Sequence, residues 1–217
     1  ILDSREKIKA IDSHNLLGSV ETLPDQIQDA WEATKSLVFP DTFHNVSNII
    51  VSGMGGSSLG ALVIKRLFKD ELQVPLEIYP HYHLPGYASS DSLVILSSYS
   101  GITEETLAAA EHAEKVGAKI AVITGGGTLA EIAKSKGWPM YVIDPKFNPC
   151  GQPRMAIGYA VFGMLSMFAK MGLINIAESQ VLQIVDNLKE QVSQLNPEGA
   201  NDLAKLMAFA CYDKHVV

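Results

Sequence analysis

NIIVSGMGGSSLGALVIKRLF, residues 48–68, carries the clearest signal of the fold. It opens with an apolar, β-branched run that predicts a buried strand over 48–52. Apolar residues then recur at helical spacing from position 59 to position 68, which predicts a helix. Between the two lies a segment rich in glycine and serine, residues 53–58, which we call the first loop. A strand, a tight loop and a helix in this order are the start of a βαβ unit.

The same alternation continues as far as position 143. Strands are predicted at 76–79, 92–97, 119–124 and 140–143, and helices at 104–116 and 128–136. Strands that alternate with helices of this length form parallel units with right-handed crossovers. The pattern therefore predicts an α/β fold with a doubly wound five-stranded parallel sheet flanked by helices, a flavodoxin-like sandwich. Helical patterns at both ends predict N- and C-terminal helical extensions, and we expect the N-terminal one to pack on the sheet.

Composition places the chain among ordinary globular proteins, since 47% of its 217 residues are hydrophobic and 19% are charged. The net charge of −7 argues against a nucleic acid or an anionic membrane as partner. Two cysteines, Cys150 and Cys211, form neither a disulfide framework nor a metal-ligand spacing, which fits a reducing compartment. No signal-peptide pattern is visible at the N-terminus, and we expect a cytoplasmic protein.

His81 and His83 are spaced like a pair of metal ligands. No third cysteine, histidine or carboxylate stands at ligand spacing from them, so a polar loop at the end of a strand is favoured. We therefore predict no metal site. The apolar helix expected within 154–172 is hydrophobic nearly all round, which predicts burial against a second domain or a subunit.

The first loop has the composition of an anion site. Glycine lets the backbone approach a ligand closely, and the following helix offers unpaired N–H groups at the positive end of its dipole. Ser57 and Ser58 add hydroxyl donors. Two other interpretations stay open: a serine that only caps the helix, and a dinucleotide-binding turn that Gly53 and Gly55 match while Ser58 replaces its third glycine.

A second loop, SSYSGIT at residues 97–103, again joins a predicted strand to a predicted helix. Its hydroxyl side chains suit a phosphate monoester at a helix N-terminus, and they come from Ser97, Ser98, Ser100 and Thr103. The alternative is an ordinary helix start with Thr103 as N-cap and Glu104 and Glu105 favouring the dipole. Because both loops fall at the carboxyl edge of one sheet, we favour a joint phosphate site, with the two glutamates splayed outward.

Arg154 follows Pro153 at the expected start of the apolar helix. A fixed guanidinium at this place could stabilise negative charge on an enediolate oxygen. Its position alone favours a structural role, so both interpretations stay open.

Together the three segments resemble the sugar isomerase (SIS) domain family. The resemblance rests on GMGGS at 53–57, SYSGITEET at 98–106 and the dipeptide Pro153-Arg154. It is strong over 45–175, and it is closest to the N-terminal half of the bifunctional phosphoglucose/phosphomannose isomerases of archaea and bacteria. Two positions depart from the family pattern, with Ser58 in place of a glycine and Ile102 in place of a frequent asparagine.

The resemblance implies an aldose–ketose isomerase of glycolysis or gluconeogenesis. It would convert glucose 6-phosphate or mannose 6-phosphate to fructose 6-phosphate through a cis-enediolate, without a metal or another cofactor. Its partner would be a small sugar phosphate, and the full-length enzyme would be a homodimer. Arg154 would be the catalytic residue, and the binding residues would be Gly55, Gly56, Ser57, Ser98, Ser100 and Thr103.

The resemblance also suggests a division of the chain. We expect a helical lead-in at 1–45, a SIS phosphosugar-binding domain at 46–175 and a helical linker or packing segment at 176–214. The run KHVV at 214–217 is typical of a strand start, so residues 215–217 would begin a second SIS domain that carries the proton-transfer groups. The chain alone would then bind its substrate without turning it over. Two alternatives remain: a regulatory SIS domain that senses a phosphosugar, and a single-domain isomerase with Glu104 or Glu105 as base.

Overall fold

The computed structural model describes residues 4–199 and 203–214. Its centre is a parallel sheet of five strands in the order β2-β1-β3-β4-β5. The strands are β1 (Asn48–Gly53), β2 (Leu76–Ile78), β3 (Ser92–Ser98), β4 (Lys119–Thr124) and β5 (Met140–Val142). The predicted α/β fold and the predicted strands are confirmed, with small differences at their ends.

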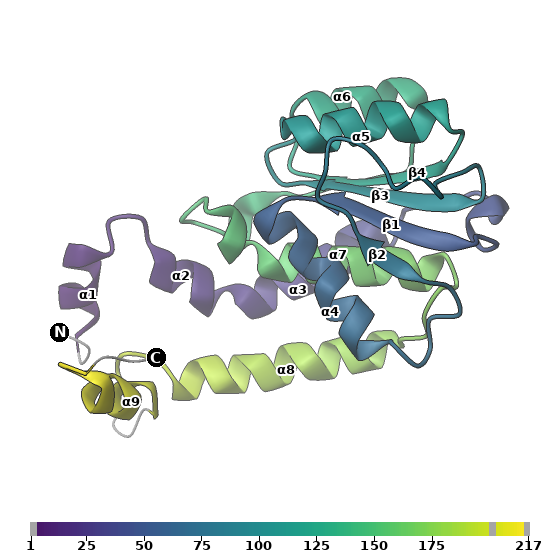
Figure 1. The fold of residues 1–217 in the computed structure, drawn as a ribbon. Helices are drawn as coiled ribbons and strands as arrows, with labels where there is room; N and C mark the ends of the chain where they lie inside the picture. Colours follow the sequence, from purple (N-terminus) through teal and green to yellow (C-terminus); the bar gives the residue numbers. More distant parts are fainter. Residues whose placement is uncertain (1–3, 200–202, 215–217) are drawn as a thin grey trace.

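Helices cover both faces of the sheet (Figure 1). One face carries α5 (Glu104–Lys115) and α6 (Gly127–Lys136), and the other carries α4 (Leu59–Leu67) and α7 (Ile157–Lys170). Because both faces are covered, every residue of β3 is buried, as is every residue of β1 after Asn48. Burial on both faces explains why these strands are continuous apolar runs rather than alternating ones.

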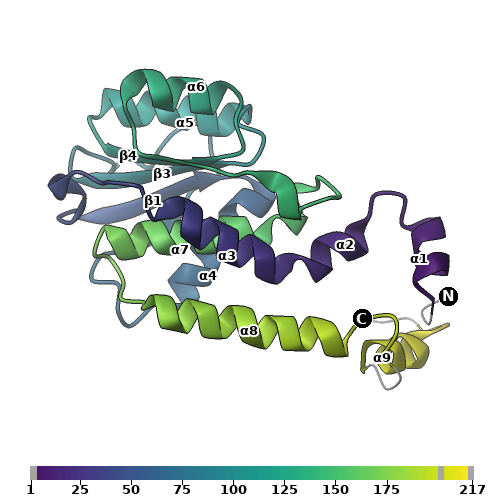
Figure 2. The ribbon, with the colours of Figure 1, turned by 180° about the vertical axis from the view of Figure 1, so that it is seen from behind.

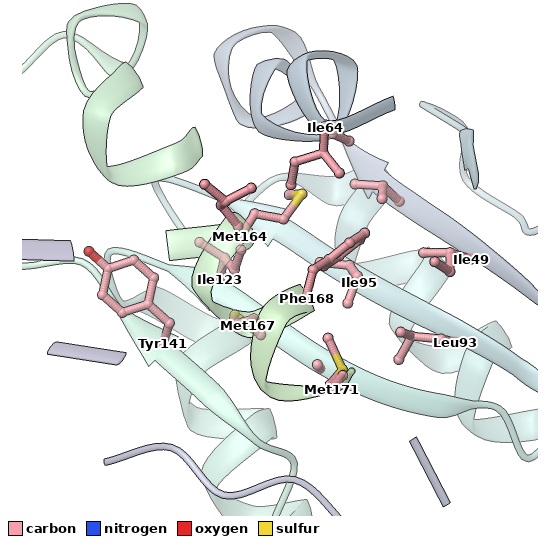
Figure 3. Close-up of a cluster of buried hydrophobic side chains, with 14 of the residues drawn as sticks. Ile49, Ile64, Leu93, Ile95, Ile123, Tyr141, Met164, Met167, Phe168 and Met171 are labelled. Carbon is pink, nitrogen blue, oxygen red and sulfur yellow. The ribbon is translucent and has the colours of Figure 1, made fainter. Parts of the chain in front are cut away.

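The larger core lies between the sheet and the layer formed by α4 and α7. Figure 3 shows Ile95 and Ile123 of the sheet lying close to Ile64 of α4 and Phe168 of α7. The helix α7 is apolar nearly all round because the sheet lies on one side of it and α3 (Leu23–Thr34) on the other. The expectation that a second domain or subunit buries this helix is therefore wrong, since elements of this chain do so.

The N-terminal extension is helical, as predicted, and consists of α1 (Arg5–Ile11), α2 (Leu16–Glu21) and α3. Its contacts differ from the expectation. Helix α3 packs chiefly on α7 and on α8 (Glu178–Gln194) rather than on the sheet, because α7 already occupies that face. Ile27 and Trp31 of α3 meet Val181 and Val185 of α8 in a smaller core.

The C-terminal extension returns toward the N-terminus. In both views α9 (Leu203–Cys211) lies near α1, at the end of the molecule far from the sheet (Figures 1 and 2). Arg5 bridges Glu21 and Glu198 at 2.7 and 3.0 Å, and its hydrogen bond to Glu198 holds the pKa of that carboxyl below the usual range. Apart from Lys214, the strand start expected at 214–217 lies outside the described residues. Within the described ranges, none of the helices has both the length and the apolar character that crossing a bilayer requires.

Candidate functional site

The two loops meet where the strand order reverses. From β1 the chain passes through α4 on one face, and from β3 it passes through α5 on the other face. The strands β1 and β3 are neighbours, and Gly53 pairs with Ser97 in their register. In a doubly wound sheet a ligand binds outside the carboxyl ends of the strands at this kind of switch point. The fold therefore brings the first and second loops to one place, as the sequence predicts.

The first loop is a short 3-10 turn, Gly55–Ser58, ahead of α4. Gly55 has a φ of +52°, a conformation that a side chain would strain. Ser57 is 9% exposed, and its Oγ accepts a hydrogen bond of 3.1 Å from the Tyr99 backbone N–H. The Ser58 hydroxyl donates to the Gly55 carbonyl at 2.8 Å and does not cap α4. Ser57 thus joins the two loops, while Ser58 acts within its own turn.

Hydroxyl groups organise the second loop from inside. Ser98 is buried, its Oγ accepts from the Gly101 N–H at 3.0 Å, and it lies 2.8 Å from the Thr103 Oγ1. The exposed Ser100 hydroxyl lies 3.5 Å from the same Thr103 oxygen. Thr103 occupies the N-cap position of α5, but its hydroxyl is directed to these serines and does not cap the helix. The N–H groups of the first turn of α5 are thereby left available to a ligand at the positive end of the dipole.

The loop between β4 and α6 fixes the backbone of the second loop. A Cβ on Gly101, whose φ is +69°, would lie 1.7 Å from the Gly126 carbonyl oxygen. A Cβ on Gly125 would lie 2.5 Å from the Tyr99 oxygen, which accepts the Gly125 N–H at 3.1 Å. Both glycines therefore permit a backbone contact that any side chain would prevent. The sequence offers no sign of this contact beyond the three adjacent glycines at 125–127.

Arg154 comes to the same edge of the sheet. It lies in a 3-10 turn, Pro153–Met155, and α7 begins only at Ile157, so the expectation that Arg154 opens the long helix is wrong. A Cβ on Gly56 would lie 3.2 Å from the Pro153 carbonyl oxygen and 3.4 Å from the Arg154 Cα. The turn that carries Arg154 therefore packs directly on the first loop, and the Arg154 side chain is exposed there.

A small cavity lies where the three segments converge. Its lining comes from both loops, from β4, from the chain after β5 and from the arginine turn with the start of α7: Gly56, Ser57, Ser97, Tyr99, Ile123, Ile143, Pro153, Ala156 and Ala160. The three segments that the sequence singled out therefore lie against one another, and of the predicted site residues Gly56 and Ser57 line this cavity, whereas Ser98, Ser100, Thr103 and Arg154 do not.

The two glutamates that begin α5 face the loop after β2. The Tyr82 hydroxyl donates to Glu104 Oε2 at 3.3 Å. The charge of Glu105, followed by partial burial and by the charge of Glu104, raises the pKa of Tyr82 above its ordinary value. Tyr82 therefore gives the Glu104 carboxylate a partner outside the second loop.

His81 and His83 lie in the loop after β2, as the sequence predicted, and His112 and Cys150 make contacts within the fold. His81 and His83 stack with centroids 6.1 Å apart beside Tyr79, and His112 Nδ1 accepts from the Leu84 N–H at 3.0 Å. Cys150 is a buried thiol that donates to Asn148 Oδ1 at 3.3 Å. Across residues 4–199 and 203–214, no three histidine, cysteine or acidic side chains stand in an arrangement that could hold a metal ion.

Several curated proteins similar to this chain are named bifunctional phosphoglucose/phosphomannose isomerase, and one is named as an epimerase. The chain is 37% identical over 200 residues to a bifunctional phosphoglucose/phosphomannose isomerase of Caldicellulosiruptor bescii, covering 90% of this chain and 57% of that protein. It is 34% identical over 154 residues to the protein of that name from Thermoplasma acidophilum, covering 70% of this chain and 43% of that protein. A D-glucosamine-6-phosphate 4-epimerase of Sulfolobus acidocaldarius is 43% identical over 89 residues, or 41% of this chain and 28% of that protein. The chain thus spans between 28% and 57% of the length of these three relatives.

Solved structures and a family model agree with this fold. A candidate tagatose-6-phosphate ketose/aldose isomerase from Clostridium novyi NT superimposes with a TM-score of 0.59 at 19% identity, covering 89% of this chain and 52% of that one. The Vibrio vulnificus NanR protein complexed with ManNAc-6P superimposes with a TM-score of 0.52 at 19% identity, covering 84% of this chain and 69% of that one. The SIS domain model matches residues 42–144, which include both loops. The chain therefore belongs to the SIS domain family.

Proposed function

We propose that this chain is the phosphosugar-binding part of an aldose–ketose isomerase. Its substrates would be glucose 6-phosphate and mannose 6-phosphate, and its product fructose 6-phosphate. The observation that carries the proposal is the meeting of the two loops and the Arg154 turn at the switch point between β1 and β3. The isomerase names of relatives at 37% and 34% identity support the same reaction.

The phosphate group would bind at the start of α5. Ser98 and Thr103 already hold each other at 2.8 Å, so the loop is ordered before a ligand arrives. The exposed Ser100 hydroxyl and the N–H groups of the first turn would then donate to the phosphate oxygens. Gly55, Gly56 and Ser57 would line the opposite side, where the two glycines have no side chain and let the sugar come close.

Arg154 would stabilise the negative charge that develops on the substrate oxygens. Isomerisation removes a proton from the carbon beside the carbonyl, and the electron pair moves onto oxygen to give the enediolate. A guanidinium held beside that oxygen lowers the energy of this state more than that of the neutral sugar. The base that removes the proton is not assigned to a residue of this chain, and we place it in the part of the longer protein that this chain does not span.

The domain division follows from the same proposal. Residues 1–45 would be a helical lead-in, 46–175 the SIS phosphosugar-binding domain and 176–214 a packing segment. The complete enzyme would be a cytoplasmic homodimer of glycolysis or gluconeogenesis. The chain alone would bind sugar phosphate and lack isomerase activity.

Calorimetric titration of the chain tests the binding half of the proposal. We expect fructose 6-phosphate and glucose 6-phosphate to bind and unphosphorylated fructose not to bind. Ser100→Ala should weaken sugar-phosphate binding by about tenfold, the value of one hydrogen bond to a charged group. Ser193→Ala, which removes an exposed hydroxyl of α8 far from the site, is the matched control and should change nothing. Equal binding of fructose with and without phosphate would contradict the proposal.

Activity assays test the catalytic half. A longer form of the protein that spans the full length of the relatives should isomerise glucose 6-phosphate, and Arg154→Ala should lower its kcat by about 100-fold. Activity of the 217-residue chain alone would overturn our placement of the base and favour Glu104 or Glu105. Binding without activity in either form would replace the isomerase by a phosphosugar sensor.

A further inference from the structure

The turn that carries Arg154 belongs to a longer segment, residues 147–158, which we call the arginine segment. Polar side chains of α2, of α3 and of the residue between them form hydrogen bonds to the arginine segment. These side chains precede the region that matches the family model, residues 42–144. Ser19 Oγ accepts from the Cys150 N–H at 3.1 Å, and the Thr22 hydroxyl donates to the Phe147 carbonyl at 2.7 Å. The N-terminal extension therefore makes specific contacts to the site and is more than a covering layer.

Gln26 makes the most extensive of these contacts and is completely buried. Its Nε2 donates to the Phe147 and Met155 carbonyls at 2.9 Å each. Its Oε1 accepts from the Gly158 N–H at 3.2 Å. One amide thus uses both its N–H donors and its oxygen to bind three backbone groups that lie on either side of Arg154 in the sequence.

Asn148 holds the arginine segment from inside and connects it to the second loop. It is 3% exposed, and its Nδ2 donates to the Tyr99 hydroxyl and to the Gln152 carbonyl, both at 3.0 Å. The Cys150 thiol donates to its Oδ1 at 3.3 Å, which fixes the orientation of the amide. Because the Tyr99 N–H binds Ser57, a continuous chain of hydrogen bonds links the first loop, the second loop and the arginine segment.

We propose that Gln26 and Asn148 are positioning residues that set the place of Arg154 relative to the two phosphate-binding loops. The inference rests on the proposed function and extends it to residues that touch no substrate. A buried network in which every polar group is satisfied is rigid, because each broken bond leaves an unpaired group in a medium of low dielectric constant. A catalytic charge needs such support, since a displacement of about 1 Å can cost a large part of the rate.

Three variants test the proposal, with one control. Gln26→Met keeps the volume and removes the three bonds, and Asn148→Ala removes the connection to the second loop. Tyr99→Phe removes a single hydroxyl, and it replaces the first two variants in the measurements if they fail to fold. The control is Thr34→Val, since Thr34 is a buried side chain of the same helix α3 whose hydroxyl lies 2.7 Å from Ser166 in α7, away from the arginine segment.

The first measurement needs no ligand. Nitrogen-15 relaxation of the chain reports the order of the Arg154 backbone amide. We expect Gln26→Met and Asn148→Ala to lower its order parameter while the amides of β3 and β4 stay rigid, and Thr34→Val to leave it unchanged. If the order parameter of the Arg154 amide is the same in Gln26→Met and in Asn148→Ala as in the wild type, the positioning role is overturned.

The second measurement is a double-mutant cycle with Arg154→Ala on ligand affinity. The probes are inorganic phosphate and D-arabinonic acid 5-phosphate, whose carboxylate carries negative charge where the enediolate would. We expect each positioning variant to weaken binding of the sugar acid by roughly fivefold to tenfold, to leave phosphate binding unchanged, and to add nothing in the Arg154→Ala background. Losses that add fully to that of Arg154→Ala, or equal losses for both probes, would overturn the proposal.

The two proposals fail in different ways. If the wild-type chain binds neither probe, the proposed function is overturned, and the relaxation measurement alone decides whether Gln26 and Asn148 order the arginine segment. If the wild type binds both probes and the cycle is additive, the function stands and the positioning role falls.

Discussion

The backbone N–H of Tyr99 donates a hydrogen bond of 3.1 Å to Ser57 Oγ, and this one bond joins two loops that lie 42 residues apart in the sequence. It crosses the switch point between β1 and β3, where the chain leaves toward opposite faces of the sheet. A small side chain with an acceptor suits this place, because Ser57 is buried and its Oγ is the acceptor for the Tyr99 N–H. The relative position of the two loops therefore depends on a hydroxyl that the sequence suggested only as a ligand donor or a helix cap.

Removal of this hydroxyl should destabilise the chain. Ser57→Ala leaves the Tyr99 N–H without its acceptor, and we expect the free energy of unfolding to fall by about 1–2 kcal/mol. Ser58→Ala is the control, because that hydroxyl donates only to the nearby Gly55 carbonyl, and it should cost less than about 0.5 kcal/mol. Urea denaturation of both variants measures the difference. Equal losses would show that the bond to Tyr99 is not important for stability.

Two glycines with the same backbone φ angle allow the cost of backbone strain to be measured apart from the cost of a steric clash. Gly101 and Gly137 both have a φ of +69°, but a Cβ added at Gly101 would lie 1.7 Å from the Gly126 oxygen, whereas one added at Gly137 would meet open space. Gly137→Ala should cost about 1 kcal/mol through backbone strain alone. Gly101→Ala should cost at least about 2 kcal/mol more, because the second loop must move away from the loop after β4. Similar denaturation midpoints for the two variants would contradict the close contact.

A buried tyrosine hydroxyl offers a stabilising substitution. Among the described residues, the Tyr141 hydroxyl finds no hydrogen-bond partner although it is buried, whereas the Tyr159 hydroxyl accepts from the Phe147 N–H at 3.1 Å. Tyr141→Phe should be neutral or raise stability by up to about 1 kcal/mol, since it removes an unsatisfied polar group. Tyr159→Phe should lower stability by about 1 kcal/mol. Thermal unfolding of the two variants checks the opposite signs.

Burial of Tyr159 also predicts a loss of stability in alkali. Burial raises the pKa of Tyr159 to about 12, and burial and the neighbouring Glu77 raise the pKa of Tyr87 to about 12. Between pH 10 and pH 12 the unfolded chain therefore releases protons that the folded chain keeps. Stability is complete below pH 10 and falls as the pH rises toward 12. Tyr159→Phe should make this fall shallower when unfolding is measured at pH 9, 10 and 11, and an unchanged slope would contradict the assignment.

Much of the fold could be predicted because its signals are local. The run Ile49, Ile50 and Val51 is apolar and β-branched without alternation, which is typical of a strand buried on both faces. Gly117 and Gly137 end helices α5 and α6 with φ values of +73° and +69°, as glycine after a helix predicts. The start of α7 could not be predicted in the same way, because the turn Pro153–Met155 is held by contacts to α3 that no local pattern contains.

The same difference between local and long-range signals applies to the candidate site. The amino-acid sequence was enough to establish that two loops rich in glycine and hydroxyl side chains follow strands and precede helices, because composition and periodicity are properties of neighbouring residues. The contacts of Gln26 and Asn148 with the Arg154 turn come from the tertiary structure alone, since the bond from Gln26 to Met155 spans 129 residues. Such a bond forms only after the sheet and α7 have packed, when a polar group that is cut off from water must find its partner within the protein.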